Sequence, residues 1–520
     1  MNWLDSAIAF ISPEWGARRA AWRNSLDEYR NYDAGNYHRL NAGWRATNQS
    51  AEITDRSYRE TVRARARDLE RNSDIMNSII GAYRRNVIGS GFQLQASTKK
   101  EKLNKDLEEL WKEWCKPRNC DVTGQQSLNQ ILRMAVTRKK VDGGILFVKR
   151  YTSEGMIPFQ LQMIEVDELD NMQMTGSKEN HRVIGGIEYN EYNRPVGYWI
   201  RQYSLDGFSI TKPMHIEAKD VIFYFEKNRP SQIREMSDMS QTITRIRDTN
   251  EFMTAVSVKE RIAACLSVFI KKALPVSGIG RSGNNDTGPK RDYDGKTLTP
   301  GMIKELNTGD EVQVVNPTGQ ATDATSFTKL QQRLAGAGQG LSYEATSRDM
   351  SETNYASARQ GAIEDGLTYG EEEEQIIGIL DEIYETFVIS CVLAGLIQAP
   401  DFWEKGKKEN YTKHEWIKAP KKWIDPLKES SATKIALQTG QKTFKQIAAE
   451  NGKDWRRQID DMAEVMEYGK KKGIDLGGVI FNDKVKEETA NPESKETDGG
   501  EGESSQEPES GKSESKTGKK

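Results

Sequence analysis

A short acidic run, Glu165, Asp167, Glu168 and Asp170, offers four potential metal ligands close together in this chain. Carboxylate oxygens are the ligands that Mg²⁺ and Ca²⁺ prefer, so such a run could hold a hard cation. However, no histidine lies within ten residues of the run, and the run leads into a segment typical of a loop. We therefore interpret it as a solvated acidic turn and predict no metal site.

Motifs for catalysis are incomplete. Gly295, Lys296 and Thr297 resemble the end of a phosphate-binding P-loop, but the first glycine of that motif would fall on Lys290, and no strand is expected before it. The chain has neither a G-x-S-x-G nor an H-E-x-x-H motif. Its histidines are scattered: His38, His181, His215 and His414. We predict that the protein is not an enzyme and uses no cofactor.

The charge of the chain is nearly balanced, with 75 Lys plus Arg against 78 Asp plus Glu and a net charge of -3. A tight nucleic-acid binder usually carries a basic surplus, because neutralising phosphates dominates its affinity. The balance disfavours such a binder and suits a protein past which a polyanion slides. The mean hydropathy of -0.76 indicates that much of the chain faces solvent or other subunits.

Cysteine usage and hydropathy indicate a reducing, aqueous compartment. The four cysteines are too sparse for a disulfide framework, and the gap from Cys115 to Cys120 fits no common zinc spacing; the others are Cys265 and Cys391. The N-terminal residues lack a basic start followed by a long apolar run, and no later window is long and apolar enough for a membrane span. We expect neither secretion nor membrane insertion.

The first half of the chain alternates from helices to strands. Helices are predicted over 54–87, stopped by Gly89 and Gly91, over 103–116, and over 127–141, where Ser127 is the expected N-cap. Strand patterns follow at 145–151, at 159–166, in a hairpin over 187–200 that turns near Asn193, and in a strand that ends near Phe225. The predicted class is therefore α+β.

Arginines are frequent in the first of these helices and suggest two interpretations. We interpret them as a solvated helical face, and the alternative is a contact with phosphate or with another subunit. They are Arg63, Arg65, Arg67, Arg71, Arg84 and Arg85.

The second half is mainly helical. Helical periodicity covers 243–262 and 326–341, with a loop at 274–297 and a strand at 311–315 between them. The clearest helix spans 371–394, where Ile376, Leu380, Ile383, Phe387 and Cys391 form one apolar stripe. We expect residues 402–424 to be irregular, helices at 429–440 and 455–473, and a disordered tail beyond Phe481.

Between two predicted helices lies a polar stretch, GLSYEATSRDMSETNYASARQG, residues 340–361. Polar loops longer than about 12 residues are usually functional or disordered. Because the flanking segments are well patterned, we expect a functional loop here.

Several segments, in order, resemble the lambda-type family of phage portal proteins. They are RARDLERNSDIMNSIIGAYRRNVIGSGFQLQ, LQMIEVDELD, GIEYNEYNRPVGYWI, NRPSQIREMS, LTPGMIKELNTGDEVQ, the polar stretch above, and WIDPLKESSATKIALQTGQKTFKQIAAENGKDWRRQ. The resemblance covers roughly residues 50–475. It departs from the family pattern after Arg229 and Pro230, where the family's R-P-G-Q is replaced by a serine-containing turn followed by Arg234 and Glu235.

The resemblance implies a ring, typically of twelve subunits, at one capsid vertex, through which double-stranded DNA enters and leaves. It also implies a division of the chain into an N-terminal arm (1–53), a wing (54–235), a first stem helix (236–264), a clip (265–320), a second stem helix (321–340), a tunnel loop (341–355), a long spine helix (356–400), a wing return with crown helices (401–480) and a tail (481–520). Implied partners are the terminase large subunit, a head-tail adaptor, and the major capsid protein or a scaffold, in the host cytoplasm and then in the virion.

Under this resemblance the polar stretch becomes the tunnel loop that lines the DNA channel. Small polar side chains suit that role, since apolar ones would stick and a dense basic ring would trap phosphates. Arg348 and Asp349 would form adjoining rings of opposite sign, and Lys329 and Arg333 of the second stem helix are further channel candidates. The expected lining residues are Ser342, Thr346, Ser347, Arg348, Asp349, Met350, Ser351, Thr353 and Asn354.

Two alternatives remain open at this point. The loop could pack between neighbouring subunits, with Lys329 and Arg333 as intersubunit salt-bridge partners. The protein could also be another ring adaptor of the head-tail junction, or a packaging nuclease or ATPase, although the motifs that the enzymes require are not visible.

Overall fold

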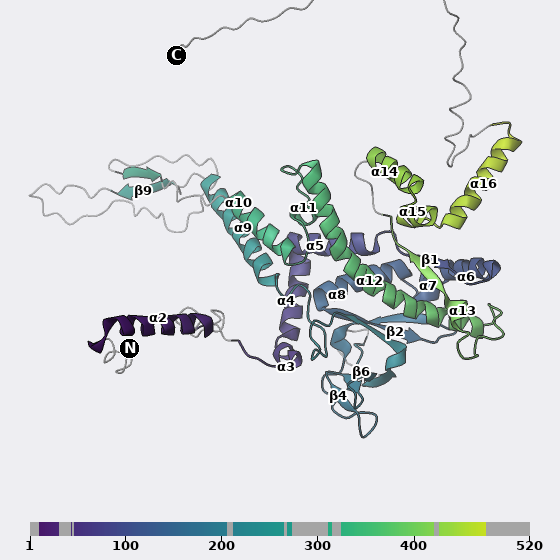
Figure 1. Cartoon of the computed structure of the whole chain (residues 1–520), viewed down its shortest axis with the longest axis horizontal. Coiled ribbons are helices and arrows are strands. Elements are labelled where there is room, and N and C mark those ends of the chain that lie inside the picture. Colours follow the sequence, from purple (N-terminus) through teal and green to yellow (C-terminus); the bar gives the residue numbers. More distant parts are fainter. Residues whose placement is uncertain are drawn as a thin grey trace, which may run out of the picture. The chain divides into compact units, whose positions relative to one another are not determined.

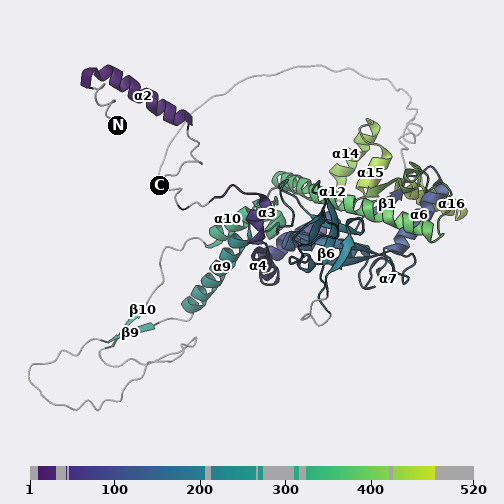
Figure 2. The ribbon, with the colours of Figure 1, turned by 90° about the horizontal axis from the view of Figure 1, so that it is seen from below.

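The computed structural model describes residues 10–30, 43, 46–204, 212–264, 268–272, 310–314, 324–420 and 426–474 (Figures 1 and 2). The chain divides into two units, Met1–Gly452 and Lys453–Lys520. Helix α16 (Trp455–Lys471) belongs to the second unit, and every other element below belongs to the first. The predicted loop at 274–297 and the predicted disordered tail lie outside the described residues.

The helix predicted over 54–87 is interrupted. Ser73 has an extended backbone (φ -122°, ψ 124°), and its side chain accepts a hydrogen bond from the Met76 amide at 3.4 Å, so a new helix begins there. Gly89 (φ 53°) ends the region as predicted. The elements are α2 (Pro13–Arg30), α3 (Ala51–Arg56), α4 (Arg59–Asn72), α5 (Asp74–Tyr83) and a π-helical turn η2 (Arg84–Ile88).

The next helices are α6 (Glu101–Trp114), α7 (Pro117–Cys120) and α8 (Leu128–Asp142). The predicted N-cap of α8 is confirmed, because the Ser127 amide donates to Gln130 Oε1 at 2.8 Å in a capping box. Gly143 ends α8 with a left-handed backbone (φ 91°), and a Cβ there would lie 2.4 Å from the Met236 carbonyl carbon. Only glycine permits this close approach of two chain segments.

Two antiparallel sheets follow, which confirms the predicted change from helices to strands. A three-stranded sheet has the order β3-β2-β8, and a four-stranded sheet has the order β4-β5-β6-β7. The predicted hairpin is β5–β6, with Asn193 left-handed (φ 58°) in its turn. The strands are β2 (Gly144–Arg150), β3 (Gln160–Ile164), β4 (Arg182–Ile184), β5 (Ile187–Tyr189), β6 (Pro195–Ile200), β7 (Met214–Glu217) and β8 (Val221–Phe225), with 3-10 turns η3 (Val166–Glu168) and η4 (Ala218–Asp220).

The helices predicted over 243–262 and 326–341 are confirmed as a packed pair, α9 (Ile243–Ala264) and α10 (Ala324–Ala337), which lie side by side in Figure 1. The ring centroids of Phe252 and Phe327 lie 4.6 Å apart between them, and Arg245 Nη1 donates to Gln331 at 2.9 Å. Beyond α9 the strands β9 (Val268–Lys272) and β10 (Asp310–Val314) pair antiparallel, in agreement with the strand predicted at 311–315.

Helix α12 (Tyr355–Leu393) is much longer than the helix that periodicity predicted over 371–394, and it begins one residue before the spine helix (356–400) that the resemblance implied. Asn354 caps it by accepting a hydrogen bond from the Ser357 amide at 2.9 Å, so the polar residues after Tyr355 are helical rather than a loop. The apolar stripe is confirmed: Ile376, Leu380, Ile383, Phe387 and Cys391 are all buried.

Residues 402–424 were predicted to be irregular, and in the described part, 402–420, this is only partly correct. They contain α13 (Glu409–Thr412) and a strand β11 (His414–Ile417), which pairs antiparallel with β1 (Gln93–Ala96). The predicted helices at 429–440 and 455–473 are confirmed as α14 (Pro426–Gln438) and α16, while α15 (Phe444–Glu450) was not predicted.

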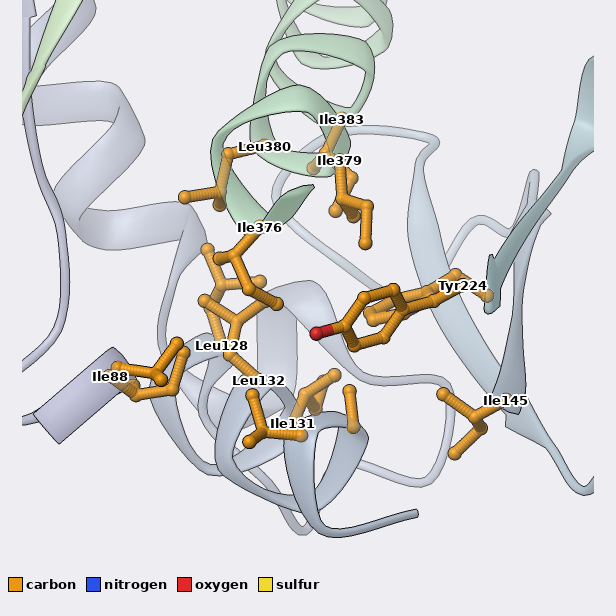
Figure 3. Packing of buried hydrophobic residues seen from close by; sticks show 14 of the residues in the cluster. Ile88, Leu128, Ile131, Leu132, Ile145, Tyr224, Ile376, Ile379, Leu380 and Ile383 are labelled. Atoms are coloured by element: carbon orange, nitrogen blue, oxygen red, sulfur yellow. The ribbon is translucent and has the colours of Figure 1, made fainter. Parts of the chain in front are cut away.

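The main core lies between α12 and the first half of the chain. Figure 3 shows Ile376, Ile379, Leu380 and Ile383 of α12 facing Leu128, Ile131 and Leu132 of α8, with Tyr224 of β8, Ile145 of β2 and Ile88 of η2 around them. A second core fills the space between the two sheets, with Leu146, Ile164 and Ile200 at its centre. None of the helices in the described part of the chain is both long and apolar enough to cross a membrane.

Replacing Phe387 by Ala should strongly destabilise the fold. Phe387 is fully buried, with its ring centroid 5.1 Å from that of Trp111, so the change should lower the free energy of unfolding by about 3 to 5 kcal/mol. Ile363→Ala on the exposed part of the same helix should cost about 0.5 kcal/mol. Urea unfolding followed by circular dichroism measures both, and equal losses would contradict this description of the core.

Candidate functional site

The stretch expected to form a single tunnel loop over 341–355 contains a short helix. Helix α11 (Tyr343–Ser347) begins after Ser342, whose side chain accepts a hydrogen bond from the Ala345 amide at 3.2 Å. A serine at this position, followed by an acidic residue in the first turn, favours such a cap. The prediction of a continuous loop was therefore wrong, and the loop proper runs from Arg348 to Asn354.

Two of the predicted lining residues, Ser342 and Thr346, make hydrogen bonds to other helices. The Ser342 amide and hydroxyl donate to the buried carboxylate of Asp365 at 2.6 and 2.7 Å, which ties α11 to α12. Thr346 is 5% exposed, and its carbonyl oxygen accepts a hydrogen bond from the hydroxyl of Ser78 on α5. The role of Asp365 was missed because it lies far along the sequence from its partners.

Arg348 and Asp349, which were expected to form two adjoining rings of opposite charge, have different surroundings. Asp349 accepts hydrogen bonds from the Ser351 amide (3.0 Å), the Ser351 hydroxyl (2.6 Å) and the Tyr343 hydroxyl (3.3 Å), and the Ser351 bonds lower the pKa of Asp349. Arg348 has a left-handed backbone (φ 60°) and an exposed side chain. The acid is held within the turn, and the base is presented outward.

The remaining predicted residues lie along the same turn. Met350 is 59% exposed, and Ser351 is exposed. Ser347 donates to the Tyr343 carbonyl oxygen at 2.8 Å, and Thr353 donates to Glu344 at 3.0 Å. The turn is thus held by local hydrogen bonds, and Met350 is the exposed large apolar side chain between residues 348 and 354.

Lys329 and Arg333 of α10 lie beside this turn, as the two cations predicted for the stem. Both pair with Glu352: Lys329 Nζ lies 2.6 Å from Glu352 Oε1, and Arg333 Nη2 lies 3.8 Å from Glu352 Oε2. The hydrogen bond from Lys329 to Glu352 raises the pKa of Lys329. Sequence reasoning missed Glu352, because only the folded chain brings it to the two cations.

A buried charged cluster lies where α12 meets α8 and the segment before α9. We call it the lysine clasp: Lys139, Lys140, Asp238 and Glu372. Lys140 Nζ lies 2.7 Å from Glu372 and 3.0 Å from Asp238, and Lys139 Nζ pairs with the same two carboxylates. Tyr224 also donates to Glu372, at 2.7 Å.

Three carboxylates at the clasp form the one group that could hold a metal ion among the described residues. Oxygens of Glu226, Asp238 and Glu372 lie within 4.8 Å of one another. The Lys139 ammonium contacts all three, so a protein cation already balances their charge. We interpret the group as an ion-pair network.

The clasp also joins the ends of the helix pair to the core. Lys140 Nζ lies 4.0 Å from the ring centroid of Tyr83 on α5, and the Tyr83 hydroxyl donates to the Gln339 carbonyl oxygen at 2.5 Å. Gln339 follows α10, and its side-chain amide donates to the Asp238 carbonyl oxygen at 3.1 Å. The start of α9 and the end of α10 are therefore fixed at one point.

The acidic run at 165–170 is not the solvated turn that was predicted. Asp167 pairs with Arg63 at 2.8 Å and with Arg67 at 2.6 Å, and Asp170 pairs with Arg201 at 2.8 Å. Arg63 is buried and Arg67 is half-buried, so the solvated-face interpretation is wrong for them. Arg65, Arg71, Arg84 and Arg85 are exposed in the single chain, which agrees with a solvated face and equally leaves them accessible to phosphate or another subunit.

The departure from the family pattern at 234–235 lies in the interior. Glu235 Oε2 accepts from Arg234 at 2.7 Å, and Glu235 Oε1 accepts from Arg63 at 3.0 Å. Arg234 also donates to the Gly185 carbonyl oxygen at 2.6 Å and the Val166 carbonyl oxygen at 2.9 Å. These two residues thus link α4 to the four-stranded sheet.

Comparison with known proteins finds a matching family model, portal proteins of phages and a chain of a gene transfer agent particle. The model of the phage portal protein, lambda family, matches residues 37–371. A probable portal protein of Halomonas phage phiHAP-1 is 25% identical over 84% of this chain and 86% of its own length, and portal protein B of Escherichia phage lambda is 21% identical over 83% and 88%. A chain from the virion of a native gene transfer agent particle is similar at a TM-score of 0.41 and 12% identity, over 74% of this chain and 94% of that chain.

Glu372→Gln should remove the charge that neutralises two buried ammonium groups, at a cost of about 3 to 5 kcal/mol at pH 7. Burial raises the pKa of Glu372, but Lys140 and Lys139 outweigh it and bring this pKa down from 4.5 to about 2. A depressed carboxyl pKa stabilises the fold above 4.5, and this contribution disappears as the pH falls toward 2.

The difference in unfolding free energy between wild type and Glu372→Gln should therefore shrink between pH 4.5 and pH 2. Urea unfolding across this range measures it. Glu374→Gln, at an exposed position of the same helix, is the matched control and should show no such trend. A difference that stays constant with pH would rule out the neutralising role.

Proposed function

Because this chain belongs to the lambda family of phage portal proteins, we propose that twelve copies of it form a ring at one capsid vertex, through which double-stranded DNA is packaged and ejected. The observation that carries the proposal is the family match over residues 37–371, together with portal relatives that align over more than four fifths of the chain. The family is structural rather than enzymatic.

The proposed division of the subunit follows the elements of the fold. The two sheets and the helices before them form the wing, α9 and α10 form the stem, and the β9–β10 pair belongs to the clip. Helix α12 is the spine, and α14 and α15 belong to the crown. The tunnel loop is limited to residues 348–354, because the residues before it form α11.

Apolar side chains on the proposed stem support assembly with other copies. Met253 and Val258 of α9 and Leu330 and Leu334 of α10 are between 38% and 52% exposed in the single chain. Burying apolar surface is favourable by about 25 cal/mol per Å². Neighbouring stems in a ring would cover these side chains.

The charges around the loop suit passage of DNA rather than tight retention. Each cation that neutralises a phosphate adds affinity through counterion release. Glu352 already pairs with Lys329 and Arg333, which reduces the pull of these two cations on a passing phosphate. We infer that Glu352 limits the hold of the stem on DNA, while the small side chains of Ser351, Thr353 and Asn354 offer weak polar contacts.

The proposed partners follow from the same role. The terminase large subunit and then a head-tail adaptor would bind the clip, and the major capsid protein or a scaffold would contact the wing. The protein would meet them in the host cytoplasm during assembly and remain in the virion at the portal vertex. No observation favours the alternatives of a smaller ring adaptor or a packaging nuclease or ATPase.

Electron-microscope class averages of the purified full-length protein test the ring. We expect rotational symmetry near twelvefold and a central hole wide enough for duplex DNA. A monomer or dimer that persists across protein concentrations and salts, with and without a scaffold protein, would overturn the proposed ring.

Glu352→Gln should release Lys329 and Arg333 for phosphate and so strengthen DNA binding. In the purified ring, the plot of log K against log salt should become steeper by about 0.9 for each additional phosphate that the ring neutralises. Glu374→Gln removes the same charge from an exposed site on α12 and is the matched control. Fluorescence anisotropy of a labelled DNA duplex measures the slope, and an unchanged slope in Glu352→Gln would contradict the neutralising role of Glu352.

A further inference from the structure

A groove of about 2310 Å³ is lined by five arginines and by Ala345 of α11, the short helix that precedes the tunnel loop. Arg84 and Arg85 of η2 line one wall, and Arg359 on α12 contributes to the lining as well. Ala345 of α11 also lines the groove, three residues before Arg348 at the start of the loop. Side chains from η2 and α12 thus line a groove that reaches α11, the helix directly before the proposed DNA-contacting turn.

Several other charges of this groove are already paired, and Arg133 donates a hydrogen bond to the Gly89 carbonyl oxygen. Lys418 pairs with Glu373 at 2.6 Å, and Arg138 pairs with Asp142 at 3.2 Å. Among the acids, Glu450 pairs with Lys442 at 2.7 Å, and Asp365 is held by Ser342.

The arginines next to the loop have no such partners. Among the residues that the structure describes, no carboxylate lies within ion-pair distance of Arg84, Arg85, Arg348 or Arg359. Burial and then the charges of Arg348 and Arg84 lower the pKa of the Arg85 guanidinium, which reflects like charges close together. Like charges gathered without counter-charges cost energy, and an anion from outside the subunit would relieve that cost.

We propose that Arg84, Arg85, Arg348 and Arg359, here called the arginine ledge, bind the phosphodiester backbone of double-stranded DNA as it passes the tunnel loop. This inference rests on the proposed function and assigns the DNA contact to residues outside the stem. Guanidinium groups bind phosphate oxygens in bidentate geometry, and phosphate contacts carry no sequence information, as a conduit for a whole genome requires.

The contrast with the stem cations supports the assignment. Lys329 and Arg333 share the carboxylate of Glu352, whereas the ledge guanidiniums are unpaired within the described subunit. The left-handed backbone of Arg348 directs the chain away from α11 at the first residue of the loop. The favourable phosphate contacts therefore lie on the η2 side of the loop, and the neutralised ones lie on the α10 side.

The test uses the full-length ring and a variant that removes three ledge charges, Arg84→Gln, Arg85→Gln and Arg348→Asn. Asn is chosen at position 348 because it tolerates a left-handed backbone. The matched control removes three charges from exposed arginines elsewhere, Arg56→Gln, Arg65→Gln and Arg182→Gln. A third variant, Arg84→Lys, Arg85→Lys and Arg348→Lys, keeps the charge at the same three positions.

Anisotropy of a labelled DNA duplex, titrated between about 50 and 200 mM KCl, gives the salt slope of each ring. We expect the ledge variant to have a slope shallower than wild type by about 0.9 for each phosphate that is no longer neutralised, while the control and the Lys variant stay close to wild type. Class averages of each variant report whether the ring forms.

The outcomes separate the inference from the proposed function. If the ring of the ledge variant has the same salt slope as the wild-type ring, the ledge does not bind DNA, and the proposed portal ring is unaffected. Loss of the ring in the ledge variant alone shows that the arginines bind carboxylates of a neighbouring copy, and it also overturns the ledge. A wild-type ring with no salt-dependent DNA binding overturns the proposed DNA contact itself.

Discussion

The placement of two lysine ammonium groups inside the protein is the constraint on which the arrangement around the loop depends. Burying an unpaired ammonium costs several kcal/mol, so Lys139 and Lys140 require acids at fixed positions. Glu372 and Asp238 supply them from two other parts of the chain. The position of α12 relative to α8 is therefore set by charge as well as by apolar packing.

That constraint reaches the loop through two short paths. The Lys140 contact with Tyr83 continues to Gln339 at the end of α10, and Asp238 lies just before α9. On α12, Asp365 lies two helical turns before Glu372 and holds Ser342 at the start of α11. Helices α9 and α10 and the turn at 348–354 thus share one anchor, and a change at the clasp alters the support of both.

The sequence predicted the elements well where local periodicity decides and poorly where distant segments meet. The stripe from Ile376 to Cys391 was predicted correctly, because a helix face is readable from spacing alone. The β1–β11 pair was missed, because a short strand whose partner lies hundreds of residues away has no recognisable local sequence pattern. Periodicity missed the first turns of α12, because they are polar and lack an apolar stripe, whereas the resemblance implied a helix from residue 356, one residue after the observed start.

The candidate site shows the same division. The resemblance implied a loop at 341–355 and named Arg348, Asp349, Lys329 and Arg333 as channel residues, but it did not reveal which of these charges are paired. Glu352 changes the interpretation of Lys329 and Arg333, and it is brought to them only by folding. Charge counting along a chain gives totals, whereas the free charge at a site depends on three-dimensional pairing.

Helix α12 has two halves of different mechanical character. Its 39 residues extend about 58 Å at 1.5 Å per residue. The half beyond Glu372 carries the buried stripe, while the half next to the loop contains Gly361, Gly366 and Gly370, each of which lowers helix stability by about 1 kcal/mol relative to alanine. The half of α12 next to the loop is therefore its less stable half, whereas the half beyond Glu372 is held by the core. A force applied at the loop should bend α12 near these glycines before it displaces the core.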